Sequence, residues 1–583
     1  MSKSKSYRGR RHPRGATVGM LALCSLVISA LAGARPLAGQ TPRGGLVLPP
    51  EVAAEVIDFY NDGATLRLVG SSHIARGNEI SGGIAVLGGP VTVAGRITGR
   101  LVVINGDVIL EPGAAIAGDI TVVGGAVRGL DAVPVQGTVV IYRAPLRFRM
   151  QGERIALAPE EEEAELATGR DFGFGRTDLL LAAHRGYNRV EGLPIVVGPR
   201  FASKSPDPIR LEALAILRTA TGLELQPKRW GYLLKAEKSF AAGAFSLGAT
   251  LRSEIDPIET AGLTDRENSL ATFLLHRDYR DHYQREGWSA RARWKLPGRP
   301  FDLALEYRDE EHSPVRARDP WTLFRGDEPW RTQPIVATGR LRSLALDLKL
   351  DTRNESQDPT TGWLVRNTIE RGVGGTLAVP QPSGGPLQSG GSVSLVAPVG
   401  VDAEFAAGSL DVRRYARLGP TSRLALRAFA ASSLNDRPLP PQRQRALGGS
   451  GSLPGYAAFA FDCGARQSAA TYDAGTFYPY YGCDRVVLLQ LEYRNDFSFG
   501  RGWGRKLGAD VDLGERIGWV VFFDAGRAWI EREAAIGRGT GQSDFAADFG
   551  LGLRLGSLGL YWAVPLSGDD RSLRFSLRLG PRL

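Results

Sequence analysis

The chain has 583 residues, of which 43% are hydrophobic and 23% are charged, and this balance excludes a globally disordered protein. The formal net charge is +10, but the arginines are spread along alternating segments instead of being gathered on one helix or arm. That distribution argues against a nucleic-acid-binding protein. The length allows several ordinary domains, or one large barrel with a smaller domain beside it.

Residues 1–39 have the pattern of a signal peptide. The basic stretch KSKSYRGRRHPR is followed by the apolar run GATVGMLALCSLVISALAGA, and small residues place the expected cleavage after Ala34 or Gly39. The alternative is a signal-anchor helix, for which the apolar run is short. Residues 40–63 are expected to form a linker. We therefore expect an exported protein with no membrane-spanning helix after cleavage.

Two cysteines lie beyond the signal, Cys463 and Cys483. In an exported protein such a pair predicts one disulfide that closes a loop. The sequence holds no C-x-x-C motif and no histidine lies close to these cysteines, so we expect no metal there.

Residues 64–150 contain short β-branched runs broken by glycine. IAVLGG at 84, LVVING at 101 and ITVVGG at 120 recur at similar intervals, as the rungs of a β-solenoid do. A glycine-rich β-sandwich is the alternative. The stretch resembles the small β-helix of bactofilin, or polymer-forming, proteins. Residues 151–177 include the acidic run APEEEEAELA, which is expected to be a short helical or flexible linker.

From residue 178 to 583 the pattern changes to strict alternation. SLALDLKLD places Leu344, Leu346 and Leu348 on one face of a strand and charged or small residues on the other, and SLRFSLRLG near the end does the same. The expected strands are 190–199, 209–218, 228–238, 244–253, 270–277, 286–295, 300–308, 341–350, 362–369, 401–414, 422–431, 485–495, 517–528, 547–555, 557–564 and 571–580.

These sixteen strands have apolar outer faces, and their connections are mostly short turns at one rim and long loops at the other. The pattern predicts an all-β fold, a transmembrane β-barrel of sixteen antiparallel strands. A β-helix-like periplasmic domain is expected to precede the barrel. Closure is required because lipid cannot bond the free backbone groups of an open edge. The inward charges are mostly arginines, which favours anions if the lumen conducts. Alternatively these arginines pair with carboxylates and the lumen is plugged.

The order of several motifs resembles the C-terminal barrel of the BamA/TamA-like outer-membrane family, also described as bacterial surface antigen. They are GYNRVEGLP at 186–194, DTRNESQDPTTGW at 351–363, ALGGSGSLPGY at 446–456, VVFFDAG at 520–526 and the alternating final segment. The resemblance covers about 180–583.

The resemblance implies a loop six that enters the lumen and places its tip against an aspartate on strand thirteen. That aspartate would be Asp524, with Gly526 leaving room beside it. The tip would include Gly448, Gly449, Gly455 and Tyr456. The arginine that precedes the tip in the family is Pro454 here, so Arg443 or Arg445 is the expected substitute, unless Asp524 faces lumenal water or another strand's arginine.

Two further departures from the family concern the ends of the barrel region. Residues 41–177 lack the repeated pattern of the periplasmic POTRA domains, and the sequence ends in Gly-Pro-Arg-Leu instead of an aromatic residue. The family's seam between its first and last strands is expected at RVEGLPIVVG, where Gly192, Pro194 and Gly198 weaken pairing.

We expect no enzyme, no cofactor and no nucleic-acid partner. The histidines form no H-E-x-x-H motif, and no G-x-S-x-G elbow occurs. His276 and His282, near Asp278 and Asp281, are a weak metal candidate against the simpler interpretation of a solvated loop. The expected function is outer-membrane protein insertion, translocation or envelope assembly, with membrane lipid and client proteins as partners. The alternatives are an anchor for an envelope-organising β-helix and a passive pore.

Overall fold

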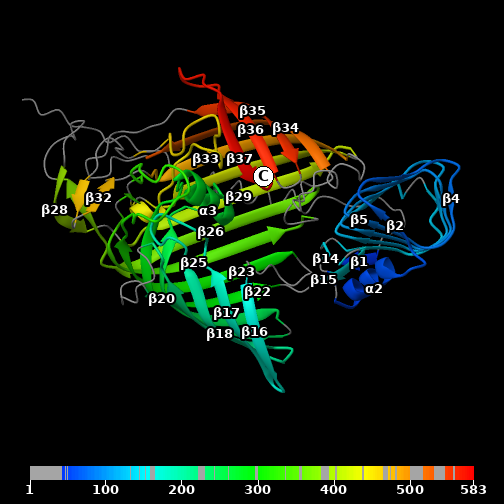
Figure 1. Cartoon of the computed structure of the whole chain (residues 1–583), viewed down its shortest axis with the longest axis horizontal. Coiled ribbons are helices and arrows are strands. Elements are labelled where there is room, and N and C mark those ends of the chain that lie inside the picture. The colour runs from blue at the N-terminus through cyan, green and yellow to red at the C-terminus, as the bar shows by residue number, and fades with distance from the viewer. Residues whose placement is uncertain are drawn as a thin grey trace, which may run out of the picture. The chain divides into compact units, whose positions relative to one another are not determined.

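The structure is a computed structural model that describes two folded regions, a solenoid and a large sheet (Figure 1). The described residues are 43–45, 48, 50–130, 133–142, 145–146, 148–151, 153–157, 165–220, 230–241, 243–259, 262–295, 300–331, 333–334, 336–353, 358–382, 393–400, 403–419, 421–435, 437, 439–461, 463, 470–472, 475–478, 482–498, 516–530, 545–555 and 558–583. The expected signal peptide, 1–39, lies outside them.

The solenoid is a three-sided parallel β-helix. One side is a six-stranded sheet of β1 (Arg43–Gly45), β13 (Val139–Tyr142), β11 (Ile120–Val123), β8 (Leu101–Ile104), β5 (Ile84–Leu87) and β2 (Leu66–Val69). The second side contains β12 (Val127–Arg128), β9 (Val108–Leu110), β6 (Val91–Val93) and β3 (Ser72–Ile74), and the third β10 (Ala115–Ile116), β7 (Arg96–Ile97) and β4 (Glu79–Ile80). The expected β-helix is confirmed.

The three recognised runs stack directly, with Leu101 beside Ile84 and Ile120 beside Leu101. All four residues of each run are buried. Alternate residues fill the inside of the solenoid, and the others lie under the helix α2 (Pro50–Asn61), whose Val56 and Tyr60 are buried against them. Residues 50–61 are therefore a helix and not a linker, because an apolar outer face of the solenoid needs a cover.

A second correction concerns residues 151–177. β14 (Phe148–Gln151) pairs with β15 (Arg154–Leu157), while Glu165–Phe172 forms β16 and Gly175–Ala183 forms β17 of the large sheet. The acidic residues that precede β16 concealed its start, because a run of charges has no strand periodicity. Residues 158–164 lie outside the described chain.

The large sheet has 17 strands, and each strand is antiparallel to its neighbours. After β16 and β17 come β18 (Ile195–Ser203), β19 (Ile209–Leu217), β20 (Trp230–Phe240), β21 (Phe245–Pro257), β22 (His282–Lys295), β23 (Phe301–Pro314), β25 (Gly339–Asp351), β26 (Gly362–Gly375), β29 (Ala406–Arg417), β30 (Ser422–Ser433), β33 (Arg485–Ser498), β34 (Arg516–Trp529), β35 (Ala546–Leu555), β36 (Leu558–Pro565) and β37 (Arg574–Leu579). The antiparallel barrel fold is confirmed, although the 17 strands are fifteen of the sixteen expected ones together with β16 and β17, which the alternation did not predict.

A small separate sheet belongs to the long loops. It contains β24 (Gln333–Pro334), β32 (Gly475–Tyr478), β31 (Ala470–Tyr472), β28 (Val393–Gly400) and β27 (Ala378–Pro382). These strands come from three different loops, so the loops at that rim are joined to one another.

One expected strand, 270–277, is wrong. Asp265–Leu275 forms the helix α3 in the loop between β21 and β22. Thr264 caps the helix and Glu267 completes a capping box, a T-x-x-E signature that is visible in the sequence. The apolar residues of LATFLL suggested a strand only because a short apolar run is ambiguous between the two structures.

The two faces of the sheet differ as the alternation predicted. On β25, Leu344 and Leu346 are exposed while Ala345 is buried, and on β34 Trp519 and Phe523 are exposed while Phe522 and Asp524 are buried. Aromatic residues also pair across strands, as the half-buried Tyr493 and the exposed Trp519 do at 5.3 Å between ring centroids. An apolar outer face around a charged interior suits a lipid-facing barrel. Within the described ranges, no helix combines the length and apolarity needed to cross a membrane.

Topology can be checked with single cysteines at opposite rims. Gly326 lies in the long loop between β23 and β25, and Gly173 lies in the tight turn between β16 and β17. With Gly326→Cys, a membrane-impermeant maleimide should label intact cells. With Gly173→Cys, labelling should require permeabilisation of the outer membrane. The reverse pattern would invert the orientation.

Candidate functional site in the lumen and at the ends of the sheet

The loop between β30 and β33, residues 434–484 and called loop six below, is bound to the inner face of the sheet. Arg443 of this loop donates two hydrogen bonds to Glu370 on β26, at 2.7 and 3.0 Å, and a third to Tyr283 Oη at 3.0 Å. Burial alone would lower the pKa of Arg443, but the Glu370 carboxylate outweighs it and holds the pKa above its usual value. The pair is a charge-assisted fork that fixes the loop.

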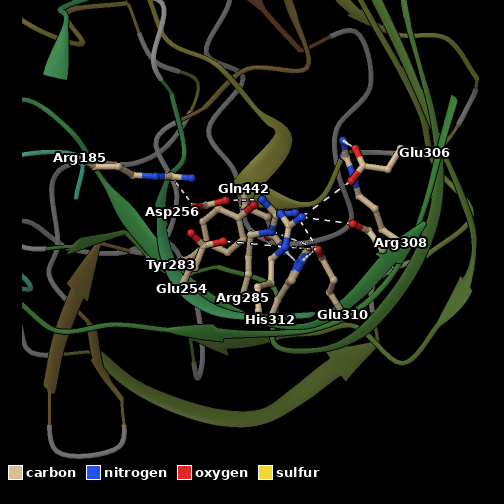
Figure 2. Close-up of polar contacts among 12 residues, drawn as sticks. Arg185, Glu254, Asp256, Tyr283, Arg285, Glu306, Arg308, Glu310, His312 and Gln442 are labelled. Carbon is tan, nitrogen blue, oxygen red and sulfur yellow. Dashed lines mark hydrogen bonds and ion pairs between the residues drawn. The ribbon is translucent and has the colours of Figure 1, made fainter. Parts of the chain in front are cut away.

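Charged side chains of β21, β22 and β23 form a paired array beside this contact (Figure 2). Arg285 binds Glu310 at 2.8 Å and also Asp256, which in turn binds Arg185. Gln442 of loop six contacts His312 at 2.9 Å between Nε2 and Nδ1. Carboxylates thus neutralise these arginines and the loop fills space among them, an arrangement that favours a plugged lumen over an anion-selective pore.

Asp524 is fully buried, and its partner is Arg582 near the end of the sequence. Gln490 on β33 also donates to Asp524, at 3.2 Å. The Arg582 guanidinium lies over the Phe522 ring, 3.7 Å from its centroid, and 3.6 Å from Glu492. A carboxylate in this apolar strand is therefore tolerated because a guanidinium from the C-terminal segment neutralises it.

The two arginines expected to substitute in loop six do not reach Asp524. Arg443 binds Glu370, as described, and Arg445 lies 3.3 Å from Glu259. The sequence predicts a partner within loop six because the resemblance implies an arginine in that loop. The Gly-Pro-Arg-Leu segment supplied the arginine instead, and no spacing rule connects residue 582 to residue 524.

The tip of loop six contacts the neighbouring strands β35 and β36. The Gly455 N–H donates to Asp548 at 2.7 Å, and Tyr456 Oη lies 2.9 Å from the Ala547 carbonyl oxygen. Asp548 is the cross-strand neighbour of Asp524. A Cβ on Gly455 would come within 2.7 Å of Asp548 Cβ, so only glycine allows this approach.

Three other glycines named from the sequence serve the same loop. Gly448 and Gly449 have φ of 114° and 83°, a left-handed region that folds the loop back on itself. Gly526, on β34, leaves space for loop six: a Cβ there would lie 2.9 Å from a methyl of Leu447.

The residues expected at the seam lie elsewhere. Gly192 and Pro194 belong to the loop before β18, and Gly198 lies within β18, which pairs with both β17 and β19. This expectation was wrong because two strands precede β18 in the sheet. The described edges are β16 and β37.

The histidines and aspartates of the loop after β21 surround an arginine. Arg189, fully buried, donates its backbone N–H to Asp278 at 3.0 Å and its guanidinium to Asp281 at 2.7 Å. His276 stacks on Trp330 with ring centroids 3.6 Å apart. In the described part of the chain, no group of three or more His, Cys, Asp or Glu side chains has the arrangement of a metal site. The cluster joins loops to one another.

The first site prediction concerns Arg582. Arg582→Ala leaves Asp524 buried without its cation and should lower the free energy of unfolding by about 3–5 kcal/mol. Arg582→Lys should recover part of that loss, since it keeps the charge but not the planar group. Urea unfolding of the refolded barrel measures both. Arg571→Ala, at an exposed arginine, is the control. A cost for Arg582→Ala no larger than the control's would contradict the role given to the pair.

The disulfide in loop six can be tested by thiol titration and by substitution. The structure joins Cys463 to Cys483 across 20 positions, with Cα atoms 5.0 Å apart, and both side chains are buried. Closing a loop of this length should stabilise the fold by ~3 kcal/mol. Unfolded but unreduced protein should show neither thiol in a titration, and Cys463→Ser with Cys483→Ser should unfold at lower urea. Two titratable thiols would refute the disulfide.

Comparison with solved structures finds only distant similarity. The chain is similar to BamA from Haemophilus ducreyi lacking POTRA domains 1–3, with 13% identity, 72% of this chain and 75% of that chain covered, and a TM-score of 0.39. It is also similar to CdiB from Escherichia coli (12% identity, 75% and 67% covered, TM-score 0.30) and CdiB from Acinetobacter baumannii (12%, 68% and 58%, TM-score 0.29). No curated protein matches the chain.

The family comparison covers the part of the sheet that holds loop six, Asp524 and the last strand. Residues 308–582 match the Omp85 superfamily domain, which confirms the resemblance seen in the sequence motifs. The match begins within β23 and includes Arg582. The Omp85 superfamily domain therefore lies in the C-terminal region of this chain.

Proposed function

We propose that this protein inserts or translocates other proteins at the outer membrane through the gap between the two edge strands of its sheet. The observation that carries the proposal is the pairing pattern. All neighbours are antiparallel and the strands number 17, so β16 and β37 run in the same direction, and no ladder joins them in the described ranges. A sheet whose ends are not joined by backbone hydrogen bonds can separate there without first breaking a ladder.

The last strand is the weaker of the two ends. β37 pairs with β36 over six residues, from Arg574 to Leu579, whereas β16 at the other end pairs with β17 over eight, from Glu165 to Phe172. Fewer backbone bonds hold β37, so less free energy is needed to displace it. Its exposed edge would offer backbone donors and acceptors to an extended segment of a client protein.

Under this proposal the chain acts without catalysis, its clients are outer-membrane proteins, and the solenoid lies in the periplasm. The Omp85 domain and the lumenal docking of loop six support it. The paired lumenal charges speak against a passive anion pore. A second function, anchoring an envelope-organising β-helix, is favoured by the solenoid itself, whose core is continuous from Ile74 to Val139.

Depletion of the protein separates these functions. If it inserts or translocates clients, an inventory of outer-membrane proteins by quantitative mass spectrometry should show several other barrels falling together as the protein disappears. Restoring the full chain should return them. A chain without residues 64–150 tests the anchor: if other barrels are unchanged by depletion and only envelope shape responds to loss of the solenoid, the insertion proposal fails.

A further inference from the structure

The free edge of the last strand is bonded to a side chain. The Leu579 N–H points away from β36 and donates to Glu267 Oε1 of α3 at 2.8 Å. The same oxygen accepts from Arg578 Nε at 2.7 Å. α3 lies beside β37 in the fold (Figure 1). A carboxylate thus takes the position that the carbonyl of a neighbouring strand would occupy in a continuous ladder.

Glu267 divides its two oxygens between the helix and the strand. Oε2 accepts from the Thr264 N–H at 2.8 Å and from the Thr264 hydroxyl at 3.0 Å, completing the capping box, while Oε1 faces β37. Burial alone would raise the pKa of Glu267, but Arg578 and these donors hold it below its usual value. The carboxylate is therefore ionised at neutral pH, and its bonds to β37 are charge-assisted.

α3 is fixed to the opposite end of the sheet as well. The Asn268 amide donates to Asp278 at 2.9 Å, and Asp278 accepts from the backbone of Arg189, which lies in the loop between β17 and β18. Arg280 donates to the Leu263 carbonyl, just before the helix, at 2.5 Å. The helix therefore links the first part of the sheet to its last strand by side-chain bonds.

The contact between α3 and β37 is only partly packed. A cavity of about 630 Å³ separates them, and its lining includes Leu270 and Leu274 of the helix and Phe575 and Leu577 of the strand. Leu270 and Phe575 are 45% and 57% exposed. The N–H groups of Phe575 and Leu577 share the edge of the Leu579 N–H, because alternate residues of a strand face the same side. The helix thus holds the end of this edge while leaving the rest accessible.

We propose that α3 is a latch on the seam, which Glu267 keeps closed by occupying the edge N–H of β37 and which opens when Glu267 withdraws. The latch rests on the proposed function, since it regulates the gap through which clients would pass. Withdrawal costs a few side-chain hydrogen bonds and leaves the β36–β37 ladder intact. The exposed apolar surfaces of α3 and β37 can then separate without unfolding either element.

Hydrogen–deuterium exchange tests the latch independently of any client. In the full chain in lipid nanodiscs, Glu267→Ala should speed exchange of the β37 amides by about tenfold, since an edge bond is lost. Thr264→Ala is the matched control, because it removes the helix cap but leaves the carboxylate facing β37. Its effect on β37 should stay within about twofold. Unchanged β37 exchange in Glu267→Ala, or an equal rise in Thr264→Ala, would overturn the role of Glu267.

A tether tests whether the latch must open. Leu270→Cys with Leu577→Cys places thiols on both walls of the cavity, and the native cysteines are held in their disulfide. Joining them in cells with a short bismaleimide should lower other barrels as depletion does, while single-cysteine variants with the same reagent should not. A tethered protein that maintains the barrels lost on depletion would overturn the latch while leaving the proposed function standing. If depletion itself changes nothing, the proposed function fails and the exchange experiment alone decides the latch.

Discussion

A backbone N–H or C=O group that faces lipid must have a hydrogen-bond partner, because hydrocarbon provides none and each unpaired group costs several kcal/mol. In a continuous barrel the neighbouring strand satisfies this constraint everywhere. In this chain the two ends of the sheet satisfy it differently. At the first end, β16 forms an antiparallel ladder with β17 from Glu165 to Phe172. At the other end, the Leu579 N–H of β37 donates a hydrogen bond to the Glu267 carboxylate of α3.

The same asymmetry extends into the lumen. Side chains from the chain's last residues and from loops hold the region around β37: Arg582 binds Asp524, Arg578 donates to the Ser450 carbonyl at 2.9 Å, and the Ser567 N–H donates to Tyr456 at 3.2 Å. These contacts join the last strand and the preceding loop to β34 and to loop six. Movement of β37 is thereby coupled to loop six, which is also bound to the distant strand β26 through Arg443 and Glu370.

The alternation of the sequence predicted most of the sheet, since lipid outside and charge inside impose a period of two on every spanning strand. Alternation alone does not predict segments whose structure depends on helix capping, on neighbouring charges or on tertiary contacts. The alternation missed β16 because acidic residues precede it, and it missed β17 because Leu179, Leu180 and Leu181 follow one another without alternating. It also assigned part of α3 to a strand, although Thr264 and Glu267 carry a helix-capping signature. Asp524 was identified as a buried carboxylate that needs a partner. Arg582 could not be found, because the contact depends on how the residues after β37 turn into the lumen, and that path is set by tertiary packing.

Two kinds of bond therefore hold the ends of this sheet, and they differ in how they break. Displacing β16 means breaking its backbone ladder to β17, in which neighbouring bonds depend on one another. Displacing the edge of β37 from α3 means breaking charge-assisted contacts of one carboxylate, which can exchange for bonds to water or to another strand one at a time. The lower barrier lies on the side held by side chains. The last strand is accordingly the part of the barrel that can move while the first strands, the α3 anchor at Arg189 and loop six keep their places.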